Sequence, residues 1–242
     1  MLNAHMRTNQ GVATRPVRAF FTGPSRSGKT STALSFPNPL LVSAADENGA
    51  RVADNLPFHV SVVECGGFQA GKSSNGPALM DVVRWCSAEA RNKTLRRADG
   101  SPVGTIIIDS LSHFESMLMS ELVGPGKMEQ QTWGVLLEAW KAFRAALWAL
   151  PVHVVLTCLD EVKQAKDGRI IGHTNALKGQ IGALLPSECD IIAYTEQEAD
   201  GVFMAYMCRR GMFTGGGRIP GMPNGAYQNF NFGAHIAPYL GA

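Results

Sequence analysis

The feature that most constrains this chain is the segment 23–30, which reads GPSRSGKT. It matches the P-loop pattern G-x-x-x-x-G-K-[ST] at every fixed position. The apolar residues 17–22 predict a buried strand before it, and residues 30–35 predict a helix that ends at Pro37. In this order of strand, turn and helix, the backbone N–H groups of the turn and the N-terminus of the helix point at the same bound phosphate group. The alternative is a glycine-rich turn that precedes a helix by chance, which does not explain the matching flanks.

Each position of this motif has an expected role. The Lys29 ammonium is expected to contact the β and γ phosphates of a nucleotide, and the Thr30 hydroxyl is expected to hold Mg²⁺. The predicted nucleotide-binding residues are the whole turn and the start of the helix: Gly23, Pro24, Ser25, Arg26, Ser27, Gly28, Lys29, Thr30 and Ser31.

Two acidic residues follow the next predicted strand. Residues 39–43 form an apolar run that leads directly to Asp46 and Glu47. The carboxyl end of a parallel strand faces the crevice in which doubly wound sheets bind ligands, so Glu47 is a candidate catalytic base. The alternative is that Asp46 caps a turn and Glu47 is solvated, as most loop acids are.

A third apolar strand also ends in an acid. Residues 103–108 are mostly β-branched or small, and Asp109 follows them. A central strand of this kind carries the acid that reaches the magnesium of a P-loop, so Asp109 is the candidate second metal residue. The same pattern also marks ordinary turns, and it is the P-loop upstream that favours the metal role.

Length and composition limit the remaining possibilities. A chain of 242 residues with 45% hydrophobic residues predicts one α/β domain over residues 17–242, preceded by a polar, flexible arm at residues 1–16. Five isolated cysteines favour neither a zinc site nor a disulfide framework. No apolar run has membrane-spanning length, so we expect a cytoplasmic protein without a membrane partner. The net charge of +2 is too small to predict nucleic-acid binding by itself.

The second half of the chain alternates long elements with polar loops. Residues 124–131 predict a loop before a long amphipathic helix over residues 132–150, and residues 152–158 predict a strand. Residues 159–174 predict a hairpin or a disordered loop whose charges also fit solvated surface. A short helix is expected over residues 175–185, and a late antiparallel hairpin follows.

The order of these parts resembles the ATPase core of RecA-type recombinases. More narrowly, it is similar to compact phage-encoded RecA-like nucleotide-binding proteins associated with single-strand annealing and recombination. The P-loop, the strand IIIDSL around Asp109 and the segment NALK at 175–178 carry the resemblance, which spans roughly residues 17–210. It implies a RecA-like P-loop fold: a mostly parallel central sheet with helices on both faces and a late antiparallel hairpin.

The resemblance also implies an activity. Lys29, Glu47 and Asp109 would be the catalytic residues of ATP hydrolysis with Mg²⁺, and Glu47 would activate the attacking water. Self-association into a ring or filament would place nucleotide near subunit boundaries. Single-stranded DNA would bind two loops with little base stacking, through Lys127, Gln130, Lys163, Lys166, Arg169, His173 and Lys178. A single-strand DNA-binding protein or annealing partner is a further expectation, and a phage-encoded protein would act in the host cytoplasm.

One departure keeps the function open. RecA-type proteins end the strand before the second loop in a glutamine, whereas this chain has Thr157, Cys158 and Leu159 there. Coupling between DNA and hydrolysis is therefore unsettled. One alternative is a nucleotide-dependent recruiting module with slow hydrolysis, and another is a small-molecule P-loop kinase, for which no arginine-rich lid is identifiable. Arg209, Arg210 and Arg218 are candidates for an arginine finger or for ordinary surface.

Overall fold

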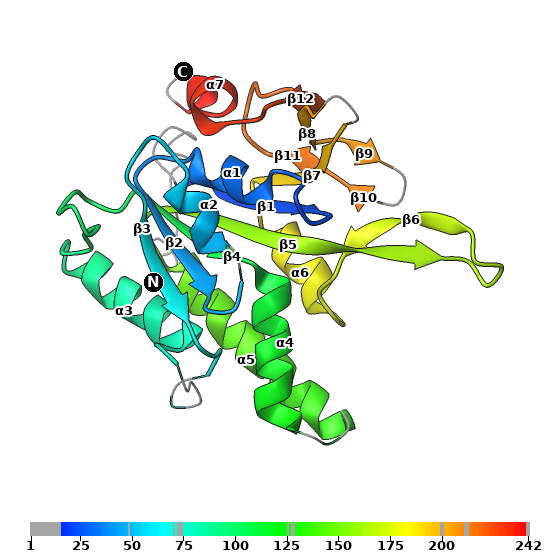
Figure 1. The fold of residues 1–242 in the computed structure, drawn as a ribbon, viewed down its shortest axis with the longest axis horizontal. Helices are drawn as coiled ribbons and strands as arrows, with labels where there is room; N and C mark the ends of the chain where they lie inside the picture. The colour runs from blue at the N-terminus through cyan, green and yellow to red at the C-terminus, as the bar shows by residue number, and fades with distance from the viewer. Residues whose placement is uncertain are drawn as a thin grey trace, which may run out of the picture.

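A parallel sheet forms the centre of the molecule (Figure 1). The computed structural model describes residues 16–47, 49–69, 71, 75–124, 126, 129–198, 201–210 and 213–240. In spatial order, the parallel strands are β3 (Ser61–Cys65), β2 (Pro39–Ala44), β4 (Thr105–Asp109), β5 (His153–Gln164), β1 (Arg18–Gly23) and β7 (Ile191–Gln197). The P-loop strand β1 and the strand β4 that ends in Asp109 are thus separated by β5.

Antiparallel strands add to this sheet at β7 and at β5, and two more form a separate pair. The predicted late hairpin is confirmed, because β7 pairs antiparallel with β8 (Phe203–Tyr206). The remaining antiparallel strands are β6 (Ile170–Asn175) on β5, β11 (Gly216–Gly217) on β7, β12 (Ala226–Gln228) on β8, and the separate pair β9 (Arg209–Arg210) and β10 (Phe213–Thr214). The tail therefore contains short strands as well as loops, and it ends in α7 (Phe232–His235) and the 3-10 turn η3 (Ala237–Tyr239).

Helices cover both faces of the sheet, as an α/β P-loop fold requires. One face packs on α3 (Leu79–Arg91), α4 (Leu111–Val123), α5 (Gln130–Trp148) and α6 (Ile181–Ser187). The other packs on α1 (Lys29–Leu34), α2 (Gly49–Asp54) and the C-terminal segment. Strand side chains alternate between the two cores, so that Ile106 and Ile108 join one and Ile107 the other.

The structure decides one open alternative and corrects one expectation. Of the hairpin and the disordered loop expected for residues 159–174, the hairpin is confirmed, because β5 continues beyond the sheet and pairs with β6 as a long projection (Figure 1). The helix expected from residue 175 begins only at Ile181, since Asn175 is the last residue of β6 and its Nδ2 donates a hydrogen bond to the Gly182 carbonyl (2.8 Å). Residues 1–15 of the expected arm lie outside the described residues.

Within the described part of the chain, none of the helices combines the length and the apolar character needed to cross a membrane.

Candidate nucleotide-binding site

Close backbone approaches explain two glycines of the P-loop. The turn connects the end of β1 at Gly23 to the start of α1 at Lys29. A Cβ on Gly23 would lie 2.1 Å from the Thr195 carbonyl oxygen. Gly28 has φ of 84°, and a Cβ there would also lie 2.8 Å from the Phe203 ring. Both positions therefore require glycine for the turn to pack against β7 and β8.

Lys29 folds over this turn. Its Nζ donates hydrogen bonds to the carbonyl oxygens of Gly23 (2.9 Å) and Pro24 (2.6 Å) and to Ser27 Oγ (3.3 Å). Burial lowers the pKa of Lys29, and attraction to Asp109 partly opposes that effect. The ammonium group is therefore placed inside the turn whose N–H groups are expected to bind phosphate.

Asp109 and Thr30 meet at the end of β4. Thr30 Oγ1 donates a hydrogen bond to Asp109 Oδ2 (2.9 Å), and Thr157 Oγ1 donates to Oδ1. Burial is the main cause that raises the pKa of Asp109, and the two hydroxyl donors oppose it. The carboxylate is thus held rigidly by neighbours on α1 and β5.

A hydroxyl and a carboxylate fit Mg²⁺, which takes oxygen ligands and commonly uses one or two protein groups plus phosphates and water. A Cβ on Gly49 would lie 2.6 Å from Asp109 Oδ2, so glycine leaves the space beside this oxygen open. Groups of three or more metal-ligating side chains do not occur among the described residues. The site therefore fits a metal that is shared with nucleotide phosphates, with Thr30 and Asp109 as the protein ligands.

Glu47 lies beside the same cleft but is bound by its neighbour. Its Oε2 accepts a hydrogen bond from the Ser110 backbone N–H (2.7 Å), and its Oε1 accepts one from Ser110 Oγ (2.8 Å). The preceding Asp46 contacts His113 Nε2 at 2.7 Å. The loop after β2 is thereby fixed to the start of α4, directly after Asp109.

These residues line one cleft of about 400 Å³. Besides residues 25–31, Glu47 and Asp109, its walls include Leu159 from β5 and Phe203 from β8. Phe203 was not predicted from the sequence, and Leu159 and Thr157 were singled out only for the missing glutamine, without the roles of lining the cleft and holding Asp109. A polar residue at the carboxyl end of a buried strand was the available signal for Thr157, whereas Phe203 has no local signal.

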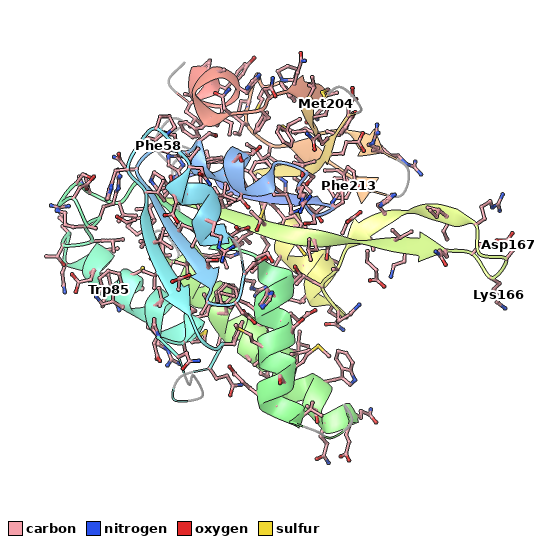
Figure 2. The ribbon with its side chains drawn as sticks, viewed as in Figure 1. Phe58, Trp85, Lys166, Asp167, Met204 and Phe213 are labelled. Atoms are coloured by element: carbon pink, nitrogen blue, oxygen red, sulfur yellow. The ribbon has the colours of Figure 1, made fainter. Side chains whose placement is uncertain are left out.

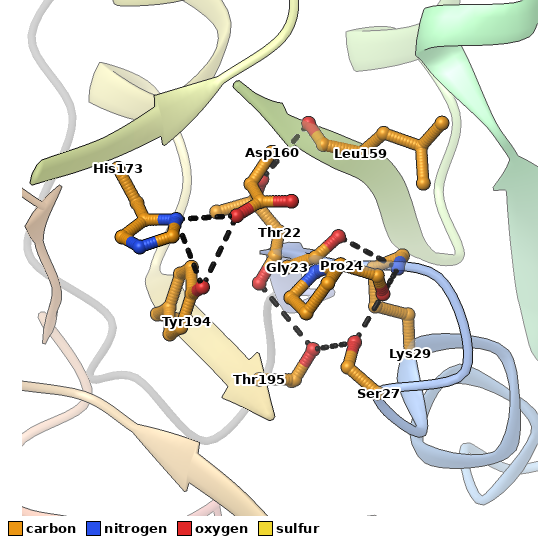
Figure 3. A network of polar contacts seen from close by, with 10 residues as sticks. All are labelled: Thr22, Gly23, Pro24, Ser27, Lys29, Leu159, Asp160, His173, Tyr194 and Thr195. Carbon is orange, nitrogen blue, oxygen red and sulfur yellow. Dashed lines mark hydrogen bonds and ion pairs between the residues drawn. The ribbon is translucent and has the colours of Figure 1, made fainter. Parts of the chain in front are cut away.

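A chain of polar contacts leads from the P-loop toward the β5–β6 hairpin (Figure 3). Ser27 Oγ is 2.8 Å from Thr195 Oγ1, which donates to the Thr22 carbonyl (3.3 Å). Thr22 Oγ1 in turn donates to the carbonyl oxygen of Leu159 (3.2 Å). The next residue, Asp160, lies at the base of the hairpin.

The Asp160 carboxylate contacts two side chains at the base of the hairpin. Its Oδ2 lies 2.7 Å from His173 Nδ1 on β6 and accepts a hydrogen bond from the Tyr194 hydroxyl on β7 (3.1 Å). Burial and the charge of Asp160 raise the pKa of Tyr194. His173, a predicted DNA contact, is thus turned toward its own chain.

The other predicted DNA contacts are spread along and beside the hairpin. Lys163 and Lys178 both contact Glu161, with Nζ to Oε2 distances of 3.2 and 3.4 Å. Lys166 lies at the hairpin tip (Figure 2), and Arg169 lies in the same turn, between the end of β5 at Gln164 and the start of β6 at Ile170. Gln130 is the first residue of α5, and Lys127 lies outside the described residues.

Two of the arginine-finger candidates are engaged within this chain. Arg210 pairs with Glu196, and its guanidinium lies 4.0 Å from the centre of the Tyr206 ring. Arg218 donates a hydrogen bond to the Ser187 carbonyl (2.6 Å). Arg209 precedes Arg210 on β9. None of these contacts places an arginine in the cleft.

Comparison with known families agrees with this geometry. A family model described as an AAA domain matches residues 15–218, a range that contains every residue lining the cleft. A search of curated proteins finds no significant match. The match supports nucleotide binding and hydrolysis, and it leaves the narrower resemblance to phage recombination proteins as a prediction.

Proposed function

This chain belongs to the AAA-domain family of P-loop ATPases, and from that premise we propose that it hydrolyses ATP while bound to single-stranded DNA during recombination, annealing or repair. The observation that carries the proposal is a single cleft that holds Lys29, Thr30, Asp109 and Glu47 and is joined by polar contacts to a projecting hairpin. Membership of this family supports ATP hydrolysis, and the link to single-stranded DNA is the part that we add as a proposal.

In this proposal the P-loop binds the phosphates of ATP. Their oxygens replace the carbonyl oxygens of Gly23 and Pro24 as acceptors for Lys29. Mg²⁺, when held by Thr30 and Asp109, supplies charge that stabilises the transferring phosphoryl group. Thr157 keeps the Asp109 carboxylate oriented toward Thr30.

Glu47 is the proposed base. It takes the proton of the attacking water while the water oxygen bonds to the γ phosphorus and the bond from phosphorus to ADP breaks. Each of its oxygens accepts one hydrogen bond from Ser110, which orients the carboxylate and leaves a further lone pair on each oxygen to accept from water.

DNA contact is assigned to the β5–β6 hairpin, which projects from the sheet with Lys166 at its tip and Arg169 in the same turn. Lysine and arginine side chains that contact backbone phosphates bind single-stranded DNA with little preference for its sequence. We further propose self-association into a ring or filament and action beside a single-strand DNA-binding or annealing partner. Exposed Val162, Ile170 and Ile171 on the same hairpin support a role in contacting other molecules.

A second function is favoured by one residue. Leu159 lines the cleft and belongs to the segment 157–159, where RecA-type proteins have a polar glutamine, and its apolar side chain cannot hydrogen-bond a phosphate. This observation supports a recruiting module in which ATP binding matters more than hydrolysis. Retention of full biological activity by a Glu47→Ala variant would favour that function.

The test is steady-state ATP hydrolysis with and without single-stranded DNA, at low and moderate salt, with Lys29→Ala as the blank. The proposal expects stimulation by DNA that weakens with salt and disappears in the variant. An equal rate of hydrolysis with and without DNA would contradict the DNA-linked function. The protein would then be an ATPase with a different role.

A further inference from the structure

A second hollow of the molecule lies between the first turns of α5 and the chain that leads into α6. We call it the α5–α6 groove; it has a volume of about 340 Å³ and is lined mainly by Trp133, Leu137, Trp140, Lys178, Gln180 and Ile181. It shares no lining residue with the nucleotide cleft. The proposed ATP chemistry therefore does not use this groove.

Two tryptophans make the groove unusual. Trp133 and Trp140 are two helical turns apart on one side of α5, and both line the groove. Trp140 is fully buried against Phe68 and Phe143, whereas Trp133 is 40% exposed. A large aromatic side chain half exposed beside a groove is typical of a binding surface.

Trp140 also carries an unpaired polar atom. Its indole Nε1 is buried and has no hydrogen-bond partner among the described residues. Because Nε1 is covered, a ligand in the groove meets the exposed ring of Trp133 rather than this donor. Nucleobases have flat aromatic faces that can stack on such a ring.

The opposite wall supplies positive charge. Lys178 follows β6 by three residues, so the groove is continuous with the hairpin that we propose contacts DNA. Lys178 and Lys163 share the single carboxylate of Glu161. This wall can therefore offer an ammonium group to a phosphate without leaving Glu161 unpaired.

The same wall is connected to the nucleotide cleft through α4. Both carboxylate oxygens of Glu115, a buried residue of α4, lie 3.1 Å from the Lys178 backbone nitrogen. α4 begins directly after Ser110, which holds Glu47. A ligand that moves the Lys178 segment would thus act on the helix that positions the proposed base.

We propose that the α5–α6 groove accepts a nucleobase of single-stranded DNA, stacked on Trp133, with a neighbouring phosphate contacted by Lys178. This inference rests on the proposed DNA-linked function and adds a base-contacting site to the phosphate contacts of the hairpin. Because every base has an aromatic face, such stacking is tolerant of sequence.

The experiment compares two oligomers of equal length, oligo(dT) and an abasic deoxyribose-phosphate strand, by fluorescence anisotropy. Wild type is compared with Trp133→Leu, which keeps an apolar side chain without an aromatic face, and with Trp133→Phe, which keeps one. Trp85→Leu is the matched control, since Trp85 is 46% exposed on α3, on the side of the molecule away from the hairpin tip (Figure 2).

The inference expects Trp133→Leu to weaken oligo(dT) binding about tenfold or more, the range of one base stacked on an aromatic residue. Abasic-strand binding should stay unchanged, and Trp133→Phe and Trp85→Leu should bind close to wild type. If wild type and Trp133→Leu bind oligo(dT) equally, the groove is not the base-contacting site. The same conclusion follows if Trp85→Leu loses as much affinity for oligo(dT) as Trp133→Leu does. In both cases the proposed DNA binding itself would stand. Failure of wild type to bind either strand would overturn the proposed DNA function and the groove assignment with it.

Discussion

Replacing Thr157 by valine removes the buried hydroxyl that holds Asp109 and changes little else in shape. In wild type this hydroxyl donates to Asp109 Oδ1, and Thr30 donates to the other oxygen. Asp109 is 3% exposed, so water cannot replace the lost donor easily. A hydrogen bond to a charged group contributes about 1.5–3 kcal/mol. We expect Thr157→Val to lose about that much free energy of unfolding at neutral pH.

The pH dependence of this loss follows from Asp109. Burial already raises its pKa above the ordinary value, so the folded state binds the proton more tightly than the unfolded chain does. Asp109 therefore reduces stability as pH rises through its folded pKa. Removing Thr157 raises that pKa further, because a donor that favours the charged form is gone. The deficit of the variant should be largest at neutral pH and shrink in acid, where the carboxyl is protonated in both proteins.

Urea denaturation of wild type and variant over a range of pH measures this deficit. Thr105→Val is the matched control, because Thr105 is a buried strand residue whose hydroxyl donates to the neutral Pro37 carbonyl (2.8 Å). It should lose about 0.5–1.5 kcal/mol, with no dependence on the titration of Asp109. A loss of unfolding free energy in Thr157→Val that stays constant with pH, or that equals the loss in Thr105→Val, would show that the Thr157 hydroxyl does not stabilise the charged form of Asp109.

Three further predictions concern groups around the site. Gly49→Ala should weaken Mg²⁺-dependent ATP binding at least tenfold in a fluorescent-nucleotide titration, because its Cβ would lie 2.6 Å from Asp109 Oδ2; unchanged binding would contradict the metal assignment. Tyr194→Phe removes a donor to Asp160 and should reduce DNA stimulation of hydrolysis severalfold with the basal rate unchanged; full stimulation would remove this network from the coupling. Burial raises the pKa of Glu115 from 4.5 to about 7, so its ionisation costs stability as pH rises through that window. Thermal melts of Glu115→Gln should therefore improve relative to wild type between those pH values, and a constant difference would contradict this.

The parts of the site that the sequence predicts are local ones. The P-loop is a continuous motif, and Glu47 and Asp109 each follow an apolar strand whose carboxyl end must face the crevice. The partners of these groups are distant in sequence. Thr195, which contacts Ser27, lies 168 residues away from it and depends on the pairing of β7 with β1. Such pairing is decided by the whole sheet, so single residues do not reveal it.

Tertiary contacts also explain the wrong helix start. Residues 175–178 read as helix formers, but the Asn175 side chain binds Gly182 and the Lys178 backbone nitrogen contacts Glu115. These contacts favour a loop over an earlier helix start. Trp133 lies on α5, where the sequence predicts a helix, and the expectation of little base stacking stays a prediction.

The most direct test of the account is ATP binding and single-turnover hydrolysis by Glu47→Gln beside wild type and Lys29→Ala. Glutamine keeps the shape of Glu47 but cannot accept the proton of the attacking water. We expect Glu47→Gln to bind ATP within a few-fold of wild type and to hydrolyse it about 10²–10⁴-fold more slowly, whereas Lys29→Ala loses binding. Hydrolysis by Glu47→Gln at the wild-type rate would contradict the assignment of this cleft's base.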